Sequence, residues 1–188
     1  MDILLMGPPG AGKGTQGALL SRHLGLPKLA TGDLLRDAVK DDTPLGRKAQ
    51  AVMEAGHLVG DDIILAIVRE ELRKPAAARG VILDGVVRTI PQAEGMELIL
   101  SELGRRIDAV LFLDVSDEEI LARLDRRRTT DGRADDDPAA VATRLRTYRA
   151  QTAPVLDWYE RRGGVRRIAA TGDIDAIADR VRAELPST

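Results

Sequence analysis

The sequence contains no cysteine and only two histidines, His23 and His57, among its 188 residues. The absence of cysteine excludes disulfides, zinc–thiolate centres and thiol chemistry. The two histidines are far apart and do not form the closely spaced pattern of a histidine-based metal site. We therefore expect no zinc site.

Aromatic residues make up only 2% of the chain, and long apolar runs are missing. Base stacking needs aromatic side chains, and the formal net charge is −2, so the composition argues against a nucleic-acid-binding protein. The N-terminal apolar run Ile3–Met6 is far too short to cross or target a membrane. We expect a cytoplasmic protein without a signal peptide and without a membrane partner.

The composition is that of a globular protein, with 44% hydrophobic and 31% charged residues, and the length suits one domain. Short apolar runs alternate with longer amphipathic segments, which predicts parallel βαβ units and an α/β fold. Strands are predicted at 2–6, 27–30, 81–84, 109–114 and 165–169. Helices are predicted at 13–24, 33–40, 46–55, 61–72, 92–103, 117–127, 139–161 and 174–185.

Two stretches do not fit this alternation. Residues 30–60 contain two short helices with no core strand after them, and residues 128–137 are polar and loop-like. Both are candidates for mobile segments that cover a site.

A glycine-rich loop, Gly7–Thr15 (GPPGAGKGT), follows the first predicted strand and opens the first predicted helix. This context is typical of a phosphate-binding loop, in which backbone N–H groups and a helix N-terminus surround phosphate oxygens. Lys13 is placed to reach the outer phosphates. The loop predicts nucleoside triphosphate binding.

The loop departs from the generic motif because Gly14 follows the lysine and the hydroxyl comes one residue later, at Thr15. In the generic motif that hydroxyl ligates magnesium, so here the metal would be held mainly by phosphates and water. Asp84 ends the apolar run Val81–Leu83, as an acid in the magnesium shell would. An aspartate at a strand end is also a common turn residue, and the sequence leaves both interpretations open.

Arginines are concentrated in residues 123–149. Localised guanidinium groups suit phosphate recognition, because each grips two oxygens. The alternative is a general preference for arginine on solvated helices. We expect Arg126 and Arg128 to be solvated.

In order and spacing, a set of motifs resembles the adenylate kinase family of nucleoside monophosphate kinases over nearly the full chain. The motifs are Gly7–Gln16, Thr31–Arg36, Asp84–Thr89 with Gln92, Arg123 with Arg127, Gly132–Asp136, Arg144 and Tyr148–Pro154. The resemblance implies a P-loop three-layer fold with a five-stranded parallel sheet. It also implies a small helical monophosphate-binding flap at about 30–59 and a short lid at about 128–137, within a single kinase domain 1–188.

The resemblance also assigns roles to residues. It implies catalytic roles for Lys13, Arg88, Arg127, Arg133 and Arg144. It implies ATP contacts from Gly10, Ala11, Gly12, Lys13, Gly14, Thr15, Arg123, Arg127 and Gly172. It implies AMP contacts from Thr31, Arg36, His57, Leu58, Val59, Gly85, Arg88, Gln92, Arg133 and Arg144. Asp84 would hold magnesium through water, and the lid has neither the length nor the cysteines for a zinc insert.

Some of these residues have simpler explanations. Thr89–Gln92 is also a capping box, so Gln92 could cap a helix rather than read a base, and Thr31 or Asp33 could be an N-cap. Trp158 and Tyr159 are expected to be packing residues. Asp135 and Asp136 either pair with lid charges or serve solubility.

One motif departs from the family. The family usually has Asp-Gly-Phe-Pro-Arg, whereas this chain has Asp84-Gly85-Val86-Val87-Arg88. The change removes an aromatic surface and a fixed backbone angle beside the monophosphate. Arg88 remains, so phosphate capture should survive.

The predicted function is reversible phosphoryl transfer from ATP to AMP, giving two ADP, by a monomeric enzyme that uses Mg²⁺ with ATP. Two alternatives stay open at this point. One is a pyrimidine monophosphate kinase, which would share the loop and the flap; the other is a weakly catalytic adenine-nucleotide sensor, which the altered Val86-Val87 turn motivates.

Overall fold

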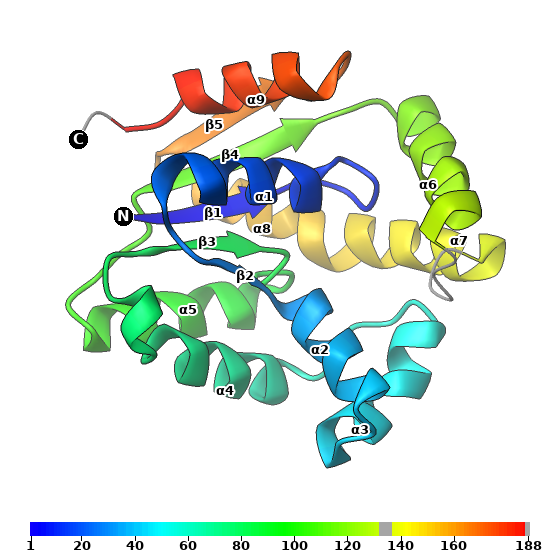
Figure 1. The fold of residues 1–188 in the computed structure, drawn as a ribbon, viewed down its shortest axis with the longest axis horizontal. Helices are drawn as coiled ribbons and strands as arrows, with labels where there is room; N and C mark the ends of the chain where they lie inside the picture. The colour runs from blue at the N-terminus through cyan, green and yellow to red at the C-terminus, as the bar shows by residue number, and fades with distance from the viewer. Residues whose placement is uncertain (132–136, 187–188) are drawn as a thin grey trace.

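The computed structural model describes residues 1–131 and 137–186, and these form an α/β fold built on one parallel sheet (Figure 1). The strands are β1 (Asp2–Met6), β2 (Lys28–Ala30), β3 (Val81–Asp84), β4 (Ala109–Asp114) and β5 (Val165–Ala169). Their order across the sheet is β2-β3-β1-β4-β5, and each neighbouring pair is parallel. All five predicted strands are confirmed, with the second starting one residue later than expected.

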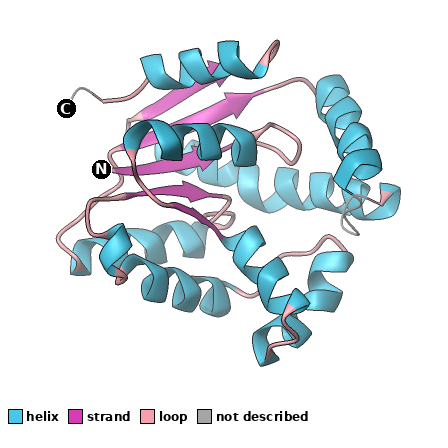
Figure 2. Ribbon diagram, viewed as in Figure 1, coloured by secondary structure: helices cyan, strands magenta, loops and turns pink. Residues whose placement is uncertain are grey.

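The helices form two covering layers and a rim beyond the carboxyl ends of the strands (Figure 2). They are α1 (Lys13–Leu24), α2 (Thr31–Lys40), α3 (Pro44–Glu54), α4 (Asp61–Leu72), η1 (Pro75–Ala77, a 3₁₀ helix), α5 (Ile90–Glu102), α6 (Asp117–Asp131), α7 (Pro138–Thr147), η3 (Tyr148–Thr152, a π-helical turn), α8 (Ala153–Glu160) and α9 (Ile174–Ala183). Helices α1 and α9 cover one face, while α4, α5 and α8 lie on the other side. The predicted three-layer fold is confirmed.

The central strand β1 shows why the sheet is covered on both faces. Its residues are all buried, and alternate side chains of a strand point to opposite faces. Ile3 and Leu5 pack in the cluster that includes α1 and α9, and Leu4 and Met6 pack in the cluster that includes α4, α5 and α8. A continuous apolar strand is what a doubly covered parallel sheet requires.

Three helices begin two residues before their predicted starts, at Thr31, Pro44 and Ile90. For the last two the reason is local. Thr43 and Thr89 each accept a hydrogen bond from a backbone N–H in the first turn, and a proline follows at the start of the helix, where its missing N–H costs nothing.

Two predictions in the second half of the chain were wrong in detail. Helix α6 continues through Asp131, so residues 128–131 are helical and not loop-like. The single helix predicted at 139–161 is interrupted by the π-helical turn Tyr148–Thr152. Pro154 follows this turn and cannot donate the i→i−4 hydrogen bond of a regular helix, which favours a wider turn before it.

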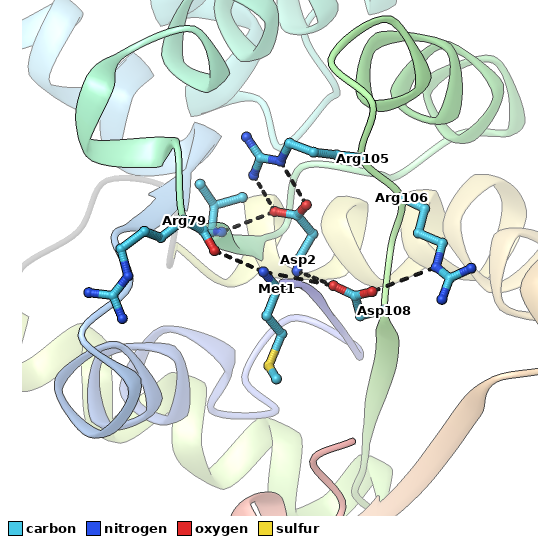
Figure 3. A network of polar contacts seen from close by, with 7 residues as sticks. Met1, Asp2, Arg79, Arg105, Arg106 and Asp108 are labelled. Atoms are coloured by element: carbon cyan, nitrogen blue, oxygen red, sulfur yellow. Dashed lines mark hydrogen bonds and ion pairs between the residues drawn. The ribbon is translucent and has the colours of Figure 1, made fainter. Parts of the chain in front are cut away.

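A polar network lies at the amino ends of the strands, opposite their carboxyl ends (Figure 3). Asp2 is 2% exposed, and its carboxylate accepts hydrogen bonds from the Arg105 guanidinium (Nε at 2.9 Å) and from the Val81 backbone N–H (3.0 Å). The Asp2 backbone N–H donates to Asp108 Oδ2 at 2.8 Å. The N-terminal ammonium of Met1 donates to the Arg79 carbonyl at 2.8 Å. The network joins β1, β3 and the segment before β4.

We expect Asp2→Ala to lower the free energy of unfolding by about 3 kcal/mol, because it leaves the guanidinium of Arg105 and a buried N–H without their acceptor. Denaturant unfolding measures the change. Asp125→Ala is the control, since Asp125 pairs with Arg128 at the surface and such pairs contribute about 1 kcal/mol or less. Equal losses in the two variants would contradict a stabilising role for the Asp2 network.

Candidate active site

The glycine loop connects β1 to α1 at the carboxyl ends of the strands, where parallel α/β sheets bind ligands. Gly10 has φ +85°, and a Cβ there would lie 3.1 Å from both the Ile120 carbonyl oxygen and Leu124 Cγ. Helix α6 therefore packs directly on the loop, and only glycine combines this backbone angle with this close approach. The loop is held between the sheet and α6.

Lys13, the first residue of α1, lies over the loop. Its Nζ donates to the carbonyls of Gly7 at 2.7 Å and Pro8 at 2.9 Å. Burial lowers the pKa of the Lys13 ammonium to about 8; Asp84 opposes this shift, while Arg88, Arg144 and Arg127 add to it. The site thus collects several positive charges around a lysine whose pKa they and burial lower, as an environment built for a polyanion would.

A first cavity lies between the loop, α2 and the segment after β3. The predicted AMP residues that line it are Thr31, Arg36, His57, Leu58, Val59, Gly85, Arg88, Gln92 and Arg144. It is narrow, about 130 Å³. Small-molecule pockets are typically about 300–1,000 Å³, so a nucleotide would need this cavity to widen.

A second cavity, about 570 Å³, lies on the other side of Lys13, under α6. The predicted ATP residues that line it are Gly10, Ala11, Gly12, Lys13, Gly14, Thr15, Arg123, Arg127 and Gly172. Asp84 also lines it.

The two cavities meet at a wall of cations. The residues that line both are Pro9, Lys13, Gly32, Arg36, Arg88 and Arg144. Among the residues that the structure describes, four of these six are lysine or arginine and none is acidic. Two adjoining cavities with a cationic boundary can hold two anionic groups next to each other.

The segment after β3 is fixed by hydrogen bonds from three directions. Thr31 Oγ1 donates to the Gly85 carbonyl at 3.1 Å, Arg88 Nε donates to the same carbonyl at 2.8 Å, and Thr152 Oγ1 donates to the Arg88 carbonyl at 2.9 Å. Val86 and Val87 are 1% and 3% exposed and join the larger core cluster. The valines therefore anchor this turn by burial, and Arg88 keeps its place between the cavities.

The arginine-rich stretch splits into two groups. Arg123, Arg127 and Arg144 are half-buried, whereas Arg126, Arg128, Arg146 and Arg149 are exposed. Arg123 and Arg127 are four residues apart and so share a face of α6. The exposed state of Arg126 and Arg128 is confirmed, although Arg126 still borders the second cavity.

Arg123 bridges the loop and the segment before α9. Its guanidinium donates to the Ala11 carbonyl at 3.3 Å and to the Ala170 carbonyl at 2.7 Å, and Glu119 accepts from its Nε at 2.7 Å. Glu119 thus holds the guanidinium at the rim of the second cavity. The Ser116 hydroxyl, before α6, accepts from the Glu119 backbone N–H at 3.3 Å.

Asp84 lies between the loop and Lys28. Its Oδ2 is 3.8 Å from Lys28 Nζ, which also pairs with Asp33 at 3.1 Å. Among residues 1–131 and 137–186, no three acidic or histidine side chains cluster as a metal site. A single carboxylate beside a phosphate-binding loop still fits Mg²⁺, which usually keeps several waters and is bound through one or two carboxylates and substrate phosphates.

The capping alternatives are resolved differently for each residue. Thr31 is the first residue of α2, not its N-cap, and its hydroxyl is used by Gly85. Asp33 lies within α2 and pairs with Arg36 at 2.5 Å and with Lys28. Gln92 does take part in a cap, since its N–H donates to Thr89 Oγ1 at 3.2 Å, but its side chain also lines the first cavity.

Some predicted residues lie outside the described part of the chain. These are Arg133, Gly132, Ala134, Asp135 and Asp136. The structure also adds cavity-lining residues that the sequence analysis missed, namely Lys28 in the second cavity and Tyr148 and Thr152 in the first. Burial raises the pKa of Tyr148 to about 12. The stretch Tyr148–Pro154 belongs to the motifs that carry the family resemblance, but helical periodicity does not separate Tyr148 and Thr152 from the rest of a long helix.

The fold and the glycine loop define a P-loop nucleotide-binding protein with two adjoining cavities beside the loop. Comparison with known proteins gives the family. The sequence profile of the adenylate kinase family matches residues 5–164, and on this basis the chain belongs to that family.

Full-length relatives support the assignment. The chain is 46% identical to the adenylate kinase of Gemmatimonas aurantiaca, covering 98% of this chain and 99% of that protein. It is 45% identical to an adenylate kinase of Thermus thermophilus (97% and 96%) and 44% identical to that of Thermobifida fusca (100% and 99%). The alignment with the G. aurantiaca protein spans 211 positions, more than this chain contains, so that relative carries residues with no counterpart here.

In the part of the chain that the structure describes, no helix has the length and apolar character needed to cross a membrane.

Proposed function

We propose that this protein catalyses ATP + AMP ⇌ 2 ADP, with ATP in the second cavity and AMP in the first. The observation that carries the proposal is the shared boundary of Lys13, Arg36, Arg88 and Arg144 between two cavities. A phosphoryl group passing between two nucleotides must cross such a boundary, where positive charge stabilises the oxygens of the transition state. The names of the relatives agree with this reaction.

The proposed chemistry needs no general base. The attacking group is an AMP phosphate oxygen that is already anionic at neutral pH. Lys13 and the loop amides hold the ATP phosphates, Arg88 and Arg36 hold the AMP phosphate, and Arg127 and Arg144 surround the transferring group, with Arg133 as a further candidate. Catalysis then consists of in-line positioning and charge stabilisation.

The remaining site residues hold the two bases. Arg123 and the Gly172 backbone lie beside the base of ATP. Thr31, the segment His57–Val59, Gly85 and Gln92 enclose the base of AMP. Support comes from their positions around two cavities that share the boundary residues Lys13, Arg36, Arg88 and Arg144.

Magnesium belongs to the proposal as the partner of ATP. When bound, it neutralises polyphosphate charge and helps to align the phosphates. Asp84 would hold it through water, with Thr15 nearby at the start of α1. Release of Asp84 from Lys28 would free Oδ2 for this purpose.

Two segments would exclude water during transfer, which prevents hydrolysis of ATP. We propose that residues 30–59, which include α2 and α3, form the monophosphate flap, and that residues 128–137 form a short lid within one domain. The small volume of the first cavity supports movement of the flap on binding. We further propose that the enzyme works as a cytoplasmic monomer.

The pKa of Lys13 gives a test of its role. In the free protein this pKa is about 8, and bound polyphosphate should raise it, because an anion favours the ammonium form. ATP binding at about pH 9 should therefore take up close to one proton, binding at about pH 7 should take up almost none through this group, and affinity should fall as pH rises above about 8. Calorimetric titration in two buffers of different ionisation enthalpy measures the uptake.

Lys13→Met serves as the control for that titration and should abolish the uptake at high pH. Wild-type binding at about pH 9 without proton uptake would remove Lys13 from the polyphosphate site.

A panel of acceptors tests the proposed substrate. With ATP as donor, kcat/KM should be highest for AMP and lower for CMP, UMP and GMP. Preference for a pyrimidine nucleotide would replace the proposal with a pyrimidine monophosphate kinase.

A further inference from the structure

Asp61, the first residue of α4, contacts the predicted base-reading residue without lining either cavity. One of its oxygens, Oδ1, accepts hydrogen bonds from Gln92 Nε2 at 2.7 Å and from Thr89 Oγ1 at 3.0 Å. Gln92 is 2% exposed and lines the first cavity. Asp61 therefore contacts the lining of the first cavity through Gln92.

The contacts of Gln92 fix which end of its amide is which. Nε2 faces the Asp61 carboxylate, and Oε1 accepts from the Arg88 backbone N–H at 2.7 Å. An ionised carboxylate can only accept and a backbone N–H can only donate. A flipped amide would place oxygen against carboxylate and N–H against N–H, so Asp61 and the backbone of Arg88 together permit one orientation.

An amide held in this way still has one hydrogen on nitrogen and one lone pair on oxygen. It can present one donor and one acceptor, in a fixed order, to a group in the cavity. Adenine is complementary to such a pair, because its 6-amino donor adjoins ring-nitrogen acceptors, and a glutamine amide pairs with adenine in this bidentate way. Guanine and uracil carry a carbonyl oxygen where adenine carries the amino group.

We propose that Asp61 is a positioning residue for base selection: it locks the Gln92 amide in the orientation that matches adenine. The inference rests on the proposed function, in which Gln92 faces the base of AMP. It also ties the first turn of α4, directly after the monophosphate flap, to the segment that carries Arg88.

A purely structural role predicts a different result. Carboxylates in the first turn stabilise a helix through its dipole, and Asp61 and Asp62 both occupy that turn of α4. Asp62 is exposed, whereas Asp61 is half-buried against Gln92 and Thr89. Asp62→Ala is therefore a matched control, with the same lost charge in the same turn.

Steady-state kinetics with ATP and either AMP or GMP provide the test. Asp61→Ala should raise KM for AMP about tenfold, the effect of losing a hydrogen bond to a charged group, and should reduce the preference for AMP over GMP by a similar factor. KM for ATP should stay within about twofold. Asp62→Ala should match the wild type, and Asp61→Asn, which keeps an acceptor oxygen, should restore most of the AMP preference.

A double-mutant cycle separates positioning from general stability. If Asp61 acts through the amide, Asp61→Ala should have no further effect on KM for AMP in a Gln92→Ala background. Two outcomes would overturn the role of Asp61 but leave the base-reading role of Gln92 intact. One is an additive effect of the two substitutions on KM for AMP. The other is a KM for AMP that is raised in Gln92→Ala but unchanged in Asp61→Ala. An unchanged KM for AMP in Gln92→Ala would overturn both the inference and the base-reading role of Gln92.

Thermal unfolding of each variant accompanies the kinetics. Asp61→Ser replaces Asp61→Ala if the alanine variant does not fold, because serine suits the first turn of a helix but is too short to keep both contacts of Asp61. The same kinetic outcomes then apply.

Discussion

Lys13→Met is expected to lower kcat for ADP formation by at least about a hundredfold, with a smaller effect on KM for AMP. The Lys13 ammonium lines both cavities and lies over the loop, bonded to the carbonyls of Gly7 and Pro8. Methionine keeps most of the side-chain volume but removes the charge. The charge also holds the ATP phosphates before transfer, so KM for ATP should rise, but kcat falls because the charge acts more strongly on the transition state.

Lys48→Met controls for the loss of a lysine, since Lys48 is exposed on α3 away from the cationic wall. It should leave kcat unchanged. Near-normal turnover in Lys13→Met would remove Lys13 from the catalytic group, and with it the central role proposed for the glycine loop.

Arg88→Ala is expected to raise KM for AMP about a hundredfold and KM for ATP only a few fold. Arg88 borders both cavities, but its position is fixed by residues of the first one. Its Nε donates a hydrogen bond to the Gly85 carbonyl, and its own carbonyl accepts one from Thr152 Oγ1. Removal of its guanidinium should leave the monophosphate without its main cation. Initial rates measured over a matrix of both substrates give the two constants.

Arg73→Ala is the control, because Arg73 is exposed at the end of α4. Equal losses for ATP and AMP in Arg88→Ala would place Arg88 outside the monophosphate site.

The fold could be predicted from the sequence because its signals are local. Apolar runs of three to five residues define β1, β3 and β4. Caps mark helix starts; an example is Asp137 before Pro138, where the Asp137 carboxylate accepts from the Ala139 N–H. The π-helical turn at Tyr148–Thr152 could not be predicted, since its shape depends on packing against the segment of Arg88 as well as on Pro154. Such tertiary contacts have no sequence period.

The candidate site was predicted unevenly for the same reason. The glycine loop carries its own signature, and its residues take the expected place between β1 and α1. The helical spacing of Arg123 and Arg127 and the packing of α7 decide which arginines of residues 123–149 face the second cavity. The contacts of Lys28 with Asp33 and Asp84, and of Asp61 with Gln92, join segments that sequence spacing alone does not relate.

The most direct measurement is phosphorus NMR of the purified protein with ATP, AMP and Mg²⁺, run beside a mixture that lacks AMP. The proposed reaction should give two ADP for each ATP and AMP consumed, and the mixture without AMP should release almost no phosphate. Binding of both nucleotides without ADP formation would identify a sensor and contradict the proposed function. Rapid phosphate release without AMP would contradict transfer across the cationic wall.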